Sequence, residues 1–464
     1  MNRLLTILLL WLTLGVTEVA ATEVSGSLPV LYVLTDGERE IVSRDIDLTG
    51  VYWLDPMGKE GVEALGSKDN PLPLYIRCRG NYTWSFDKKS YHIKLWKKQP
   101  MMGMGKNKHF ALLAHADDKV GFLRNTVGFE LSRRMGLPFT PEQRPVELVI
   151  NGSYEGLYFL TETIRADENR VEIATQENGE TDAEKVKGGW LVEIDNNKNS
   201  QQLSLPIAGT DLQWLWVTYH SPDSLSDVQR NYLYNQFYDI LQAVYTPDKT
   251  STRWEELIDR ERLARFYVIQ EIVDHTEAFI GSCYLYKDVG EQQWKFGPVW
   301  DFGHAFNSSH SKQKYIYENV SFPVSIIKEL ATFPRFQQAV AHVWDEFYPA
   351  KLEGLEDFMH TFLDEIELAA VYNADRWPAY GNKDVKQTSL MAFTRLRTKV
   401  NWLEKQWRPI ILSVDQLPAD DSHTGAVYDL CGRKINTSGR EKGFYMEVQR
   451  SVTGRQTVRK IIRR

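Results

Sequence analysis

The chain has 464 residues, more than a single hydrophobic core usually serves, so at least two packed units are expected. Hydrophobic residues make up 42% and charged residues 25%, which is typical of an ordinary soluble globular protein. The net charge is −7 and no long basic block occurs, which argues against sequence-independent binding of nucleic acid.

Residues 1–21 are typical of a secretory signal peptide. Arg3 supplies the positive start, an apolar run follows from Leu4 to Val16, and small residues at 19–21 suit cleavage. The run is shorter than the roughly 20 apolar residues that span a bilayer, and no other stretch is long enough. We therefore expect an exported protein, periplasmic, cell-surface or secreted, with no transmembrane segment after removal of the signal.

Residues 22–220 are expected to form a strand-rich lobe. Short apolar or alternating runs bounded by Pro and Gly predict strands near 28–36, 71–80 and 89–98. An Asn-Gly dipeptide at 151–152 lies between two apolar runs and predicts a β-hairpin. These patterns indicate antiparallel sheet as the main content of this half.

Two further elements belong to the same half. The segment "FLRNTVGFELSRRMG", residues 122–136, has apolar positions at helical spacing, and Gly136 is placed to end a helix. The segment "GGWLVEIDNN" predicts another strand at Trp190 to Ile194.

Residues 221–415 are expected to form a helix-rich lobe. Apolar residues three and four apart predict helices over 226–245, 254–275, 324–348, 352–372 and 384–407. Between these helices, "SCYLYKD" and "WKFGPVWDFG" predict a β-hairpin inserted in the helical half. After a polar break, residues 422–464 read as short strands and turns, a small separate C-terminal β module. The whole pattern predicts an α+β protein.

One aspartate stands out at the end of an apolar run. Asp301 is followed by Phe-Gly in "KFGPVWDFGHAF", although an aspartate in such a place often only caps a turn. Upstream, a predicted helix ends near Asp274 and Glu277, and the predicted hairpin then leads directly to Asp301. Phosphoryl transfer needs one carboxylate to orient the attacking hydroxyl and a second to hold the metal that bridges the phosphates. Carboxylate oxygens of this kind suit Mg²⁺ or Mn²⁺.

The strand-rich half offers cations for phosphate groups. Arg79, Lys89 and Lys94 lie on or near predicted strands, and Glu130 on the predicted helix could orient Lys94. A solvated charged strand face is the alternative for each cation, and it is the favoured interpretation for Lys88. No Gly-x-Gly-x-x-Gly and no Walker-type loop occurs, so a nucleotide would have to be covered differently.

Several segments together resemble the spore-coat protein H (CotH) kinase family. They include "RGNYTWSFDKKSYHIKL", "FALLAHADDKVGFLRNTVGFELSRRMGLPFTP" and "FGPVWDFGHAF", and they run from about Arg79 to Phe306. The resemblance implies an atypical protein-kinase-like fold with two lobes and a nucleotide cleft between them. It also implies ATP- and metal-dependent phosphorylation of secreted or surface proteins on Ser or Thr.

The same resemblance implies roles for individual residues. Asp301 is similar to the metal-binding aspartate, Lys94 to the strand lysine with Lys89 as its rival, and Glu130 to the helix glutamate. Asp274 and Glu277 both fall near the place of the catalytic-loop carboxylate. The family often has an Asn shortly after that acid, whereas this chain has Ser282, which is then the candidate for the second metal contact.

Three functions are therefore compared. The leading one is an exported CotH-like kinase that transfers the γ-phosphate of ATP to a Ser or Thr of a protein substrate, with Lys94, Glu130 and Asp301 converging on one cleft. The second is a catalytically inactive kinase-like binding protein at the cell surface, which the departure at Ser282 favours. The third is a nucleotidyl or sugar-directed transferase on the same scaffold. The C-terminal tail resembles small secretion or sorting modules.

Overall fold

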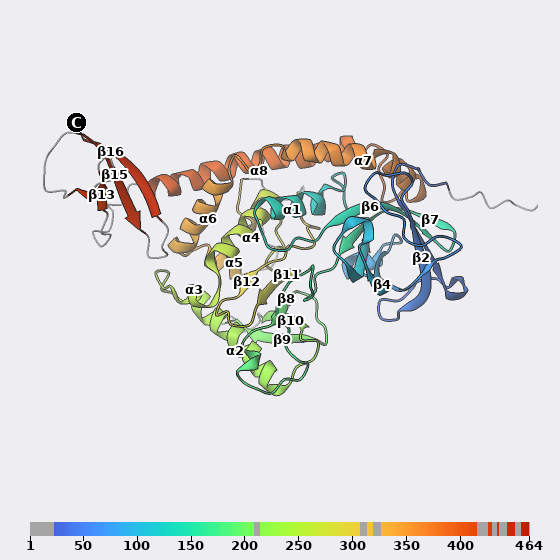
Figure 1. Ribbon diagram of the computed structural model, residues 1–464, viewed down its shortest axis with the longest axis horizontal. Coiled ribbons are helices and arrows are strands. Elements are labelled where there is room, and N and C mark those ends of the chain that lie inside the picture. Colours follow the sequence, from blue (N-terminus) through green and yellow to red (C-terminus); the bar gives the residue numbers. More distant parts are fainter. Residues whose placement is uncertain are drawn as a thin grey trace, which may run out of the picture. The chain divides into compact units, whose positions relative to one another are not determined.

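The computed structural model describes residues 23–207, 214–306, 313–318 and 326–414, and the backbone of four strands between 426 and 463. The predicted signal peptide lies outside the described residues. The chain divides into two compact units, one up to Arg408 and the other from Pro409. Helices and strands are both abundant in the first unit, which confirms the predicted α+β class (Figure 1).

Seven strands of the first unit close into a barrel in the order β1-β2-β3-β4-β5-β7-β6. Their bounds are β1 (Val30–Thr35), β2 (Leu48–Asp55), β3 (Leu72–Arg79), β4 (Ser90–Gln99), β5 (Asn107–Leu113), β6 (Gln143–Ile150) and β7 (Ser153–Glu162). Strands β1 and β6 pair in parallel, with Val30 opposite Glu147, and this pairing closes the barrel. The resemblance implied the strand-rich first lobe of a two-lobed protein-kinase-like fold. The structure instead has a closed barrel here, whose strands leave no free edge.

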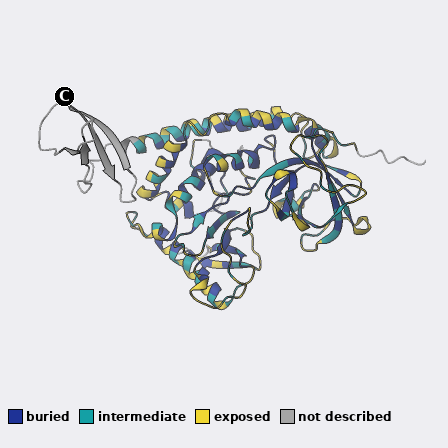
Figure 2. Cartoon of the chain, viewed as in Figure 1, coloured by how far each residue is buried: buried dark blue, intermediate teal, exposed yellow. Residues whose placement is uncertain are grey.

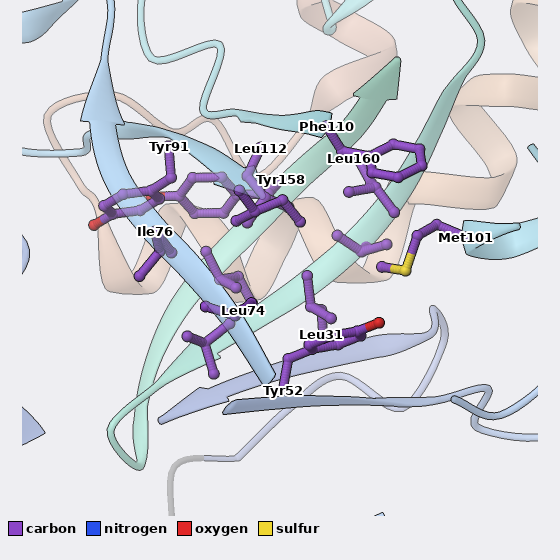
Figure 3. Packing of buried hydrophobic residues seen from close by; sticks show 14 of the residues in the cluster. Leu31, Tyr52, Leu74, Ile76, Tyr91, Met101, Phe110, Leu112, Tyr158 and Leu160 are labelled. Atoms are coloured by element: carbon purple, nitrogen blue, oxygen red, sulfur yellow. The ribbon is translucent and has the colours of Figure 1, made fainter. Parts of the chain in front are cut away.

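Alternation along each barrel strand fills the barrel with apolar side chains. Ile93 and Leu95 of β4 are buried in the core, whereas Lys94 between them is exposed. Figure 3 shows side chains from β1, β2, β3, β4, β5 and β7 packed against one another inside the barrel. The predicted alternation of "YHIKL" is thus confirmed, and it places Lys94 on the outer surface.

A second sheet has the order β12-β11-β8-β10-β9. Its strands are β8 (Trp190–Ile194), β9 (Gln202–Pro206), β10 (Trp214–Ser221), β11 (Cys283–Lys287) and β12 (Lys295–Phe296). The hairpin β11–β12 was expected to stand alone among helices, but β11 pairs with β8, with Leu285 opposite Val192. Every residue of β8 is buried, so this strand needs a partner on each side to satisfy its backbone groups.

Eight described helices complete the first unit and lead into the second: α1 (Leu123–Arg134), α2 (Asp227–Val244), α3 (Arg253–Leu257), α4 (Arg260–Ile272), α5 (Ile326–Leu330), α6 (Pro334–Phe347), α7 (Leu355–Arg376) and α8 (Val385–Val414). Two of the predicted helices are each divided in two. Asp259 caps α4 by accepting the Arg262 backbone N–H at 2.9 Å, and Pro334 starts α6, where its missing N–H costs nothing.

The long helices α7 and α8 alternate between buried and exposed residues along their length (Figure 2). Among the described helices, none is long and apolar enough to cross a membrane. Cys78 and Cys283 are buried free thiols, as expected for small core residues.

The second unit contains four described strands in the order β14-β13-β15-β16. They are β13 (Ala426–Tyr428), β14 (Lys434–Ile435), β15 (Gly443–Arg450) and β16 (Gln456–Arg463). All neighbouring pairs are antiparallel. The tail is therefore strand-rich, as its sequence pattern predicts.

Candidate functional site

A charged pocket lies where the ends of β3 and β5, the start of α1 and the segment after β12 meet. Its charged lining residues are Arg79, Asp117, Asp118, Arg124 and Asp301. The pocket volume is about 100 Å³. Sites for whole drug-sized ligands measure roughly 300–1,000 Å³, so this pocket has room for a phosphate group and an ion but not for an entire nucleotide.

Local backbone features bring the basic and acidic residues together. Strand β3 ends at Arg79, and Gly80 follows with φ 105°, in a space where a Cβ would lie 2.3 Å from the Thr83 hydroxyl oxygen. After β5, the Asp118 carboxylate accepts the backbone N–H groups of Val120 at 2.7 Å and Phe122 at 3.1 Å. These bonds organise the turn that delivers Asp117 and Arg124 to the pocket.

The position of Asp301 is fixed from helix α1. The side-chain oxygen of Asn125 accepts the Phe302 backbone N–H at 2.9 Å. Phe302 is fully buried and packs against Gly128 one turn further along α1. Because α1 holds both the backbone and the ring of Phe302, the residue after Asp301, the Asp301 carboxylate stays at the pocket.

Strained backbone occurs at the same pocket. Two residues of its lining, His115 and Asp301, have positive φ although neither is glycine. Such conformations persist only where surrounding structure enforces them, and they concentrate at functional sites. These two conformations support a functional assignment of this region.

Asp301 lies among charges of both signs. Its side chain is exposed at the pocket, but protein atoms crowd it, and this burial raises its pKa. The neighbouring Asp117 carboxylate raises the pKa further, while Arg79 and His115 oppose the shift. The Arg79 guanidinium also lies over the Trp300 ring, 5.3 Å from its centroid. Two repelling carboxylates beside a guanidinium form a site that a divalent cation would relieve.

Glu277 is the second acid near Asp301. Its Oε1 lies 3.3 Å from Nε2 of His304, and both side chains are partly exposed. Burial raises the pKa of Glu277, His304 counteracts this, and the Asp301 charge raises it again. Glu277 is thus within electrostatic reach of Asp301 and has an accessible carboxylate.

Asp274, the alternative to Glu277, is occupied elsewhere. Its carboxylate is buried and lies 3.1 Å from Nζ of Lys399 on α8. Lys399 also pairs with Glu271 at 2.9 Å. An acceptor hydroxyl could not reach Asp274 without breaking this buried network, so Glu277 is the better candidate.

The expected convergence of Lys94, Glu130 and Asp301 does not occur. On β4, Lys94 faces Tyr75 across the strand pair, whereas Arg79 faces Ser90. Four residues along a strand is roughly 13 Å, so Arg79 and not Lys94 reaches the pocket. Glu130 instead forms ion pairs with Arg134 at 2.7 Å and Arg133 at 3.2 Å on its own helix.

Two further predicted residues have other positions. The ammonium of Lys89 donates to the Trp84 carbonyl at 2.7 Å and lies over the Trp84 ring. Ser282 is half-buried at the start of β11, while the described pocket lining comes from other segments. Neither observation supports a phosphate contact from Lys89 or a metal contact from Ser282.

Sequence reasoning missed Asp117 and Arg124, which supply a carboxylate and a guanidinium to the pocket. The signal was present in "LLAHADDKVGFLRN", where two acids and then an arginine stand between a strand and a helix. To interpret this signal, one would have had to know that the turn between β5 and α1 approaches Asp301.

Lys88 was expected on a solvated strand face, yet its side chain is 1% exposed. Its ammonium donates to the carbonyls of Ala114 at 3.0 Å and Leu157 at 2.6 Å, and lies over the Tyr158 ring. Ala114 immediately precedes His115 of the pocket. Lys88 therefore anchors the loop that carries the pocket residues.

This burial predicts a pH dependence of stability. Burial lowers the pKa of Lys88 to about 7, against about 10.4 in an unfolded chain. Between these values the unfolded state binds a proton that the native state lacks, so stability rises with pH by on the order of 1 kcal/mol per unit. Urea unfolding at pH 7, 8 and 9 should show this rise in the wild type and a smaller rise in Lys88→Met, in which Lys287, with its pKa lowered to about 8, still contributes. Equal slopes for both proteins would contradict the assignment.

Gly128 allows α1 to approach the Asp301 segment. A Cβ at this position would lie 2.3–2.4 Å from atoms of the buried Phe302 ring. Alanine would gain about 1 kcal/mol of helix propensity, but overpacking against the fully buried Phe302 costs about 1–3 kcal/mol. We expect Gly128→Ala to lower the melting temperature, whereas Arg133→Ala, on an exposed side of α1, should have little effect. A Gly128→Ala protein as stable as the wild type would show that Phe302 can shift.

The structure is thus an α+β protein with three carboxylates and two guanidinium groups in one cavity, and groups of these kinds can bind metal ions and phosphate oxygens. The model of the CotH kinase protein family matches residues 76–401, which include every residue of the pocket, and the chain belongs to this family. Membership indicates a kinase-like function. None of the curated proteins compared with the chain matches it.

Proposed function

We propose that this protein is an exported kinase that transfers the γ-phosphate of ATP to Ser or Thr residues of secreted or surface proteins. The observation that carries the proposal is the charge arrangement of the pocket. Arg79 Nη1 and Arg124 Nε are buried and have no hydrogen-bond partner among the described residues, and both arginines line the pocket with Asp117 and Asp301. Unpaired buried guanidinium groups are costly, and phosphate oxygens would satisfy them.

The residues also fit a divalent metal. Among the described residues, no group of three or more His, Cys, Asp or Glu side chains could hold a metal by itself. Mg²⁺, however, is commonly bound by one or two carboxylates together with water and substrate phosphates. Asp301 and Asp117 would supply those carboxylates. A bound Mg²⁺ or Mn²⁺ would neutralise charge on the phosphates during transfer.

Each remaining residue has a defined role in this proposal. Arg79 and Arg124 would bind phosphate oxygens, since guanidinium groups present N–H donors in a fixed fork. Glu277 would accept the hydrogen bond of the attacking hydroxyl, and His304 would hold Glu277 in place. Catalysis of this kind consists mostly of positioning and charge neutralisation, which these side chains provide.

A second candidate is a kinase-like binding protein without catalytic activity. The pocket volume of about 100 Å³ favours it, because the cavity has no room for the nucleoside part of ATP. In the kinase proposal the nucleoside lies outside this cavity.

The two candidates are separated by nucleotide turnover. Purified protein is incubated with Mg²⁺ or Mn²⁺ and with ATP labelled either at the γ- or at the α-phosphate, using dephosphorylated casein as a general acceptor. The kinase proposal predicts transfer of the γ-label only, either to casein or to the protein itself. Transfer of the α-label would indicate a nucleotidyl transferase, and absence of both binding and turnover with either metal would favour the binding protein.

A further inference from the structure

A second charged cavity lies at the opposite end of helix α1 from the pocket that contains Asp301. Its volume is about 370 Å³, and it is lined by the end of α1, the first turns of α4 and the region after α6. Helices α1 and α4 are in contact, as Figure 1 shows. Four cationic side chains line it against two carboxylates, those of Glu261 and Glu346.

Two of the four cations build the walls of the cavity. Arg134 donates to the carbonyls of Lys351 at 2.9 Å and Glu353 at 2.8 Å. Arg265 pairs with Glu261 at 2.8 Å and Glu346 at 2.7 Å, and it donates to the Met135 carbonyl at 3.0 Å. Both carboxylates of the lining are therefore already paired with Arg265.

The other two cations, Arg262 and Lys351, form no ion pair with any of the described residues, although the charge of Arg262 also lowers the pKa of the neighbouring Glu261. The Nε and Nη1 atoms of Arg262 are buried and have no hydrogen-bond partner in the described part of the chain. Buried donors of charged groups are nearly always paired in folded proteins, so a missing acceptor is expected at this place.

We infer that this cavity is a binding site for a small oxyanion such as phosphate or sulfate, held by Arg262 and Lys351. A tetrahedral oxyanion offers several acceptor oxygens, which match the planar fork of a guanidinium group. Its negative charge would balance Arg262 and Lys351, since the two carboxylates of the lining pair with Arg265. The site is separate from the Asp301 pocket and stands whether or not the protein is a kinase.

The test measures anion binding to the full chain by isothermal titration, with inorganic phosphate, sulfate and O-phosphoserine as probes and with chloride as the ionic-strength control. The proteins are the wild type, Arg262→Met, Lys351→Met and Arg79→Met. Arg253→Met serves as the matched control, because Arg253 is an exposed helical arginine whose one ion pair in the described part of the chain is with Glu256.

We expect Arg262→Met to weaken one binding event at least tenfold and Lys351→Met to weaken the same event less, while Arg253→Met and Arg79→Met leave it unchanged. If only phosphate and sulfate bind, the ligand of this site is a free anion. If O-phosphoserine also binds, the ligand is a phosphorylated side chain. If Arg262→Met fails to fold, the outcome for Lys351→Met decides whether the inference holds, because Lys351 is exposed and its replacement should not disturb the fold. Absence of binding in the wild type, or unchanged binding in the decisive variant, would overturn the inference.

Discussion

Replacing Asp301 with Asn should lower the rate of γ-phosphate transfer by about 10²–10³-fold without harming the fold. The size follows from the loss of one charged group that stabilises phosphoryl transfer in a partly dehydrated site. The fold should survive because the pKa of Asp301 is raised in the native state by burial and by Asp117, so the ionised carboxylate is itself unfavourable there. The measurement compares initial rates with labelled ATP and melting temperatures for both proteins.

A matched control and a companion variant complete this test. Asp375→Asn removes an exposed carboxylate whose one ion pair among the described residues is with Lys383, and the rate of this variant should equal that of the wild type. Asp117→Asn should also slow transfer, because Asp117 lines the same pocket. An Asp301→Asn protein with full activity would remove Asp301 from the proposed mechanism.

Replacing Lys399 with Met should give the largest loss of stability, about 3–5 kcal/mol. Although burial alone would lower the pKa of Lys399, Glu271 and Asp274 raise it, which keeps the ammonium charged between them. Its ammonium also donates to the Lys314 carbonyl at 2.6 Å. Methionine fills the same space but leaves two buried carboxylates without their shared cation, so the helix end that precedes Glu277 loses its support.

Chemical denaturation measures this effect, with Lys386→Met as the control on the same helix. Lys386 is exposed and pairs with Asp364 and Glu367 at the surface, so its loss should leave the unfolding midpoint unchanged. The two variants remove the same charge from α8, and only burial distinguishes them. Equal midpoints for Lys399→Met and Lys386→Met would contradict the role given to the buried network.

Local patterns predicted those features that depend on neighbouring residues. The Asn-Gly turn at 151–152 gives the β6–β7 hairpin, with Ile150 opposite Ser153. The alternation around Ile93 and the helix ending before Gly136 are also as expected, because sequence period and turn chemistry act over a few residues. The proposed role of Asp301 was inferred from a local pattern of the same kind, an acid that follows an apolar run.

Pairing between distant segments was not visible in the same way. No local signal indicates that β1 lies beside β6 or that β8 lies beside β11, since a strand pattern shows a buried face but does not name its partner. The choice of Arg79 over Lys94 depends on the β3–β4 register, which decides which basic residue reaches the strand end near Asp301. The exclusion of Asp274 depends on Lys399, which is 125 residues away in the chain.

The most direct test is a crystal structure of the protein with Mn²⁺ and a non-hydrolysable ATP analogue, in which the anomalous signal of manganese locates the ion. We predict a manganese peak beside the carboxylates of Asp301 and Asp117, with phosphate oxygens bound to Arg79 and Arg124. A nucleotide bound elsewhere, or a manganese ion away from Asp301, would contradict the proposed site.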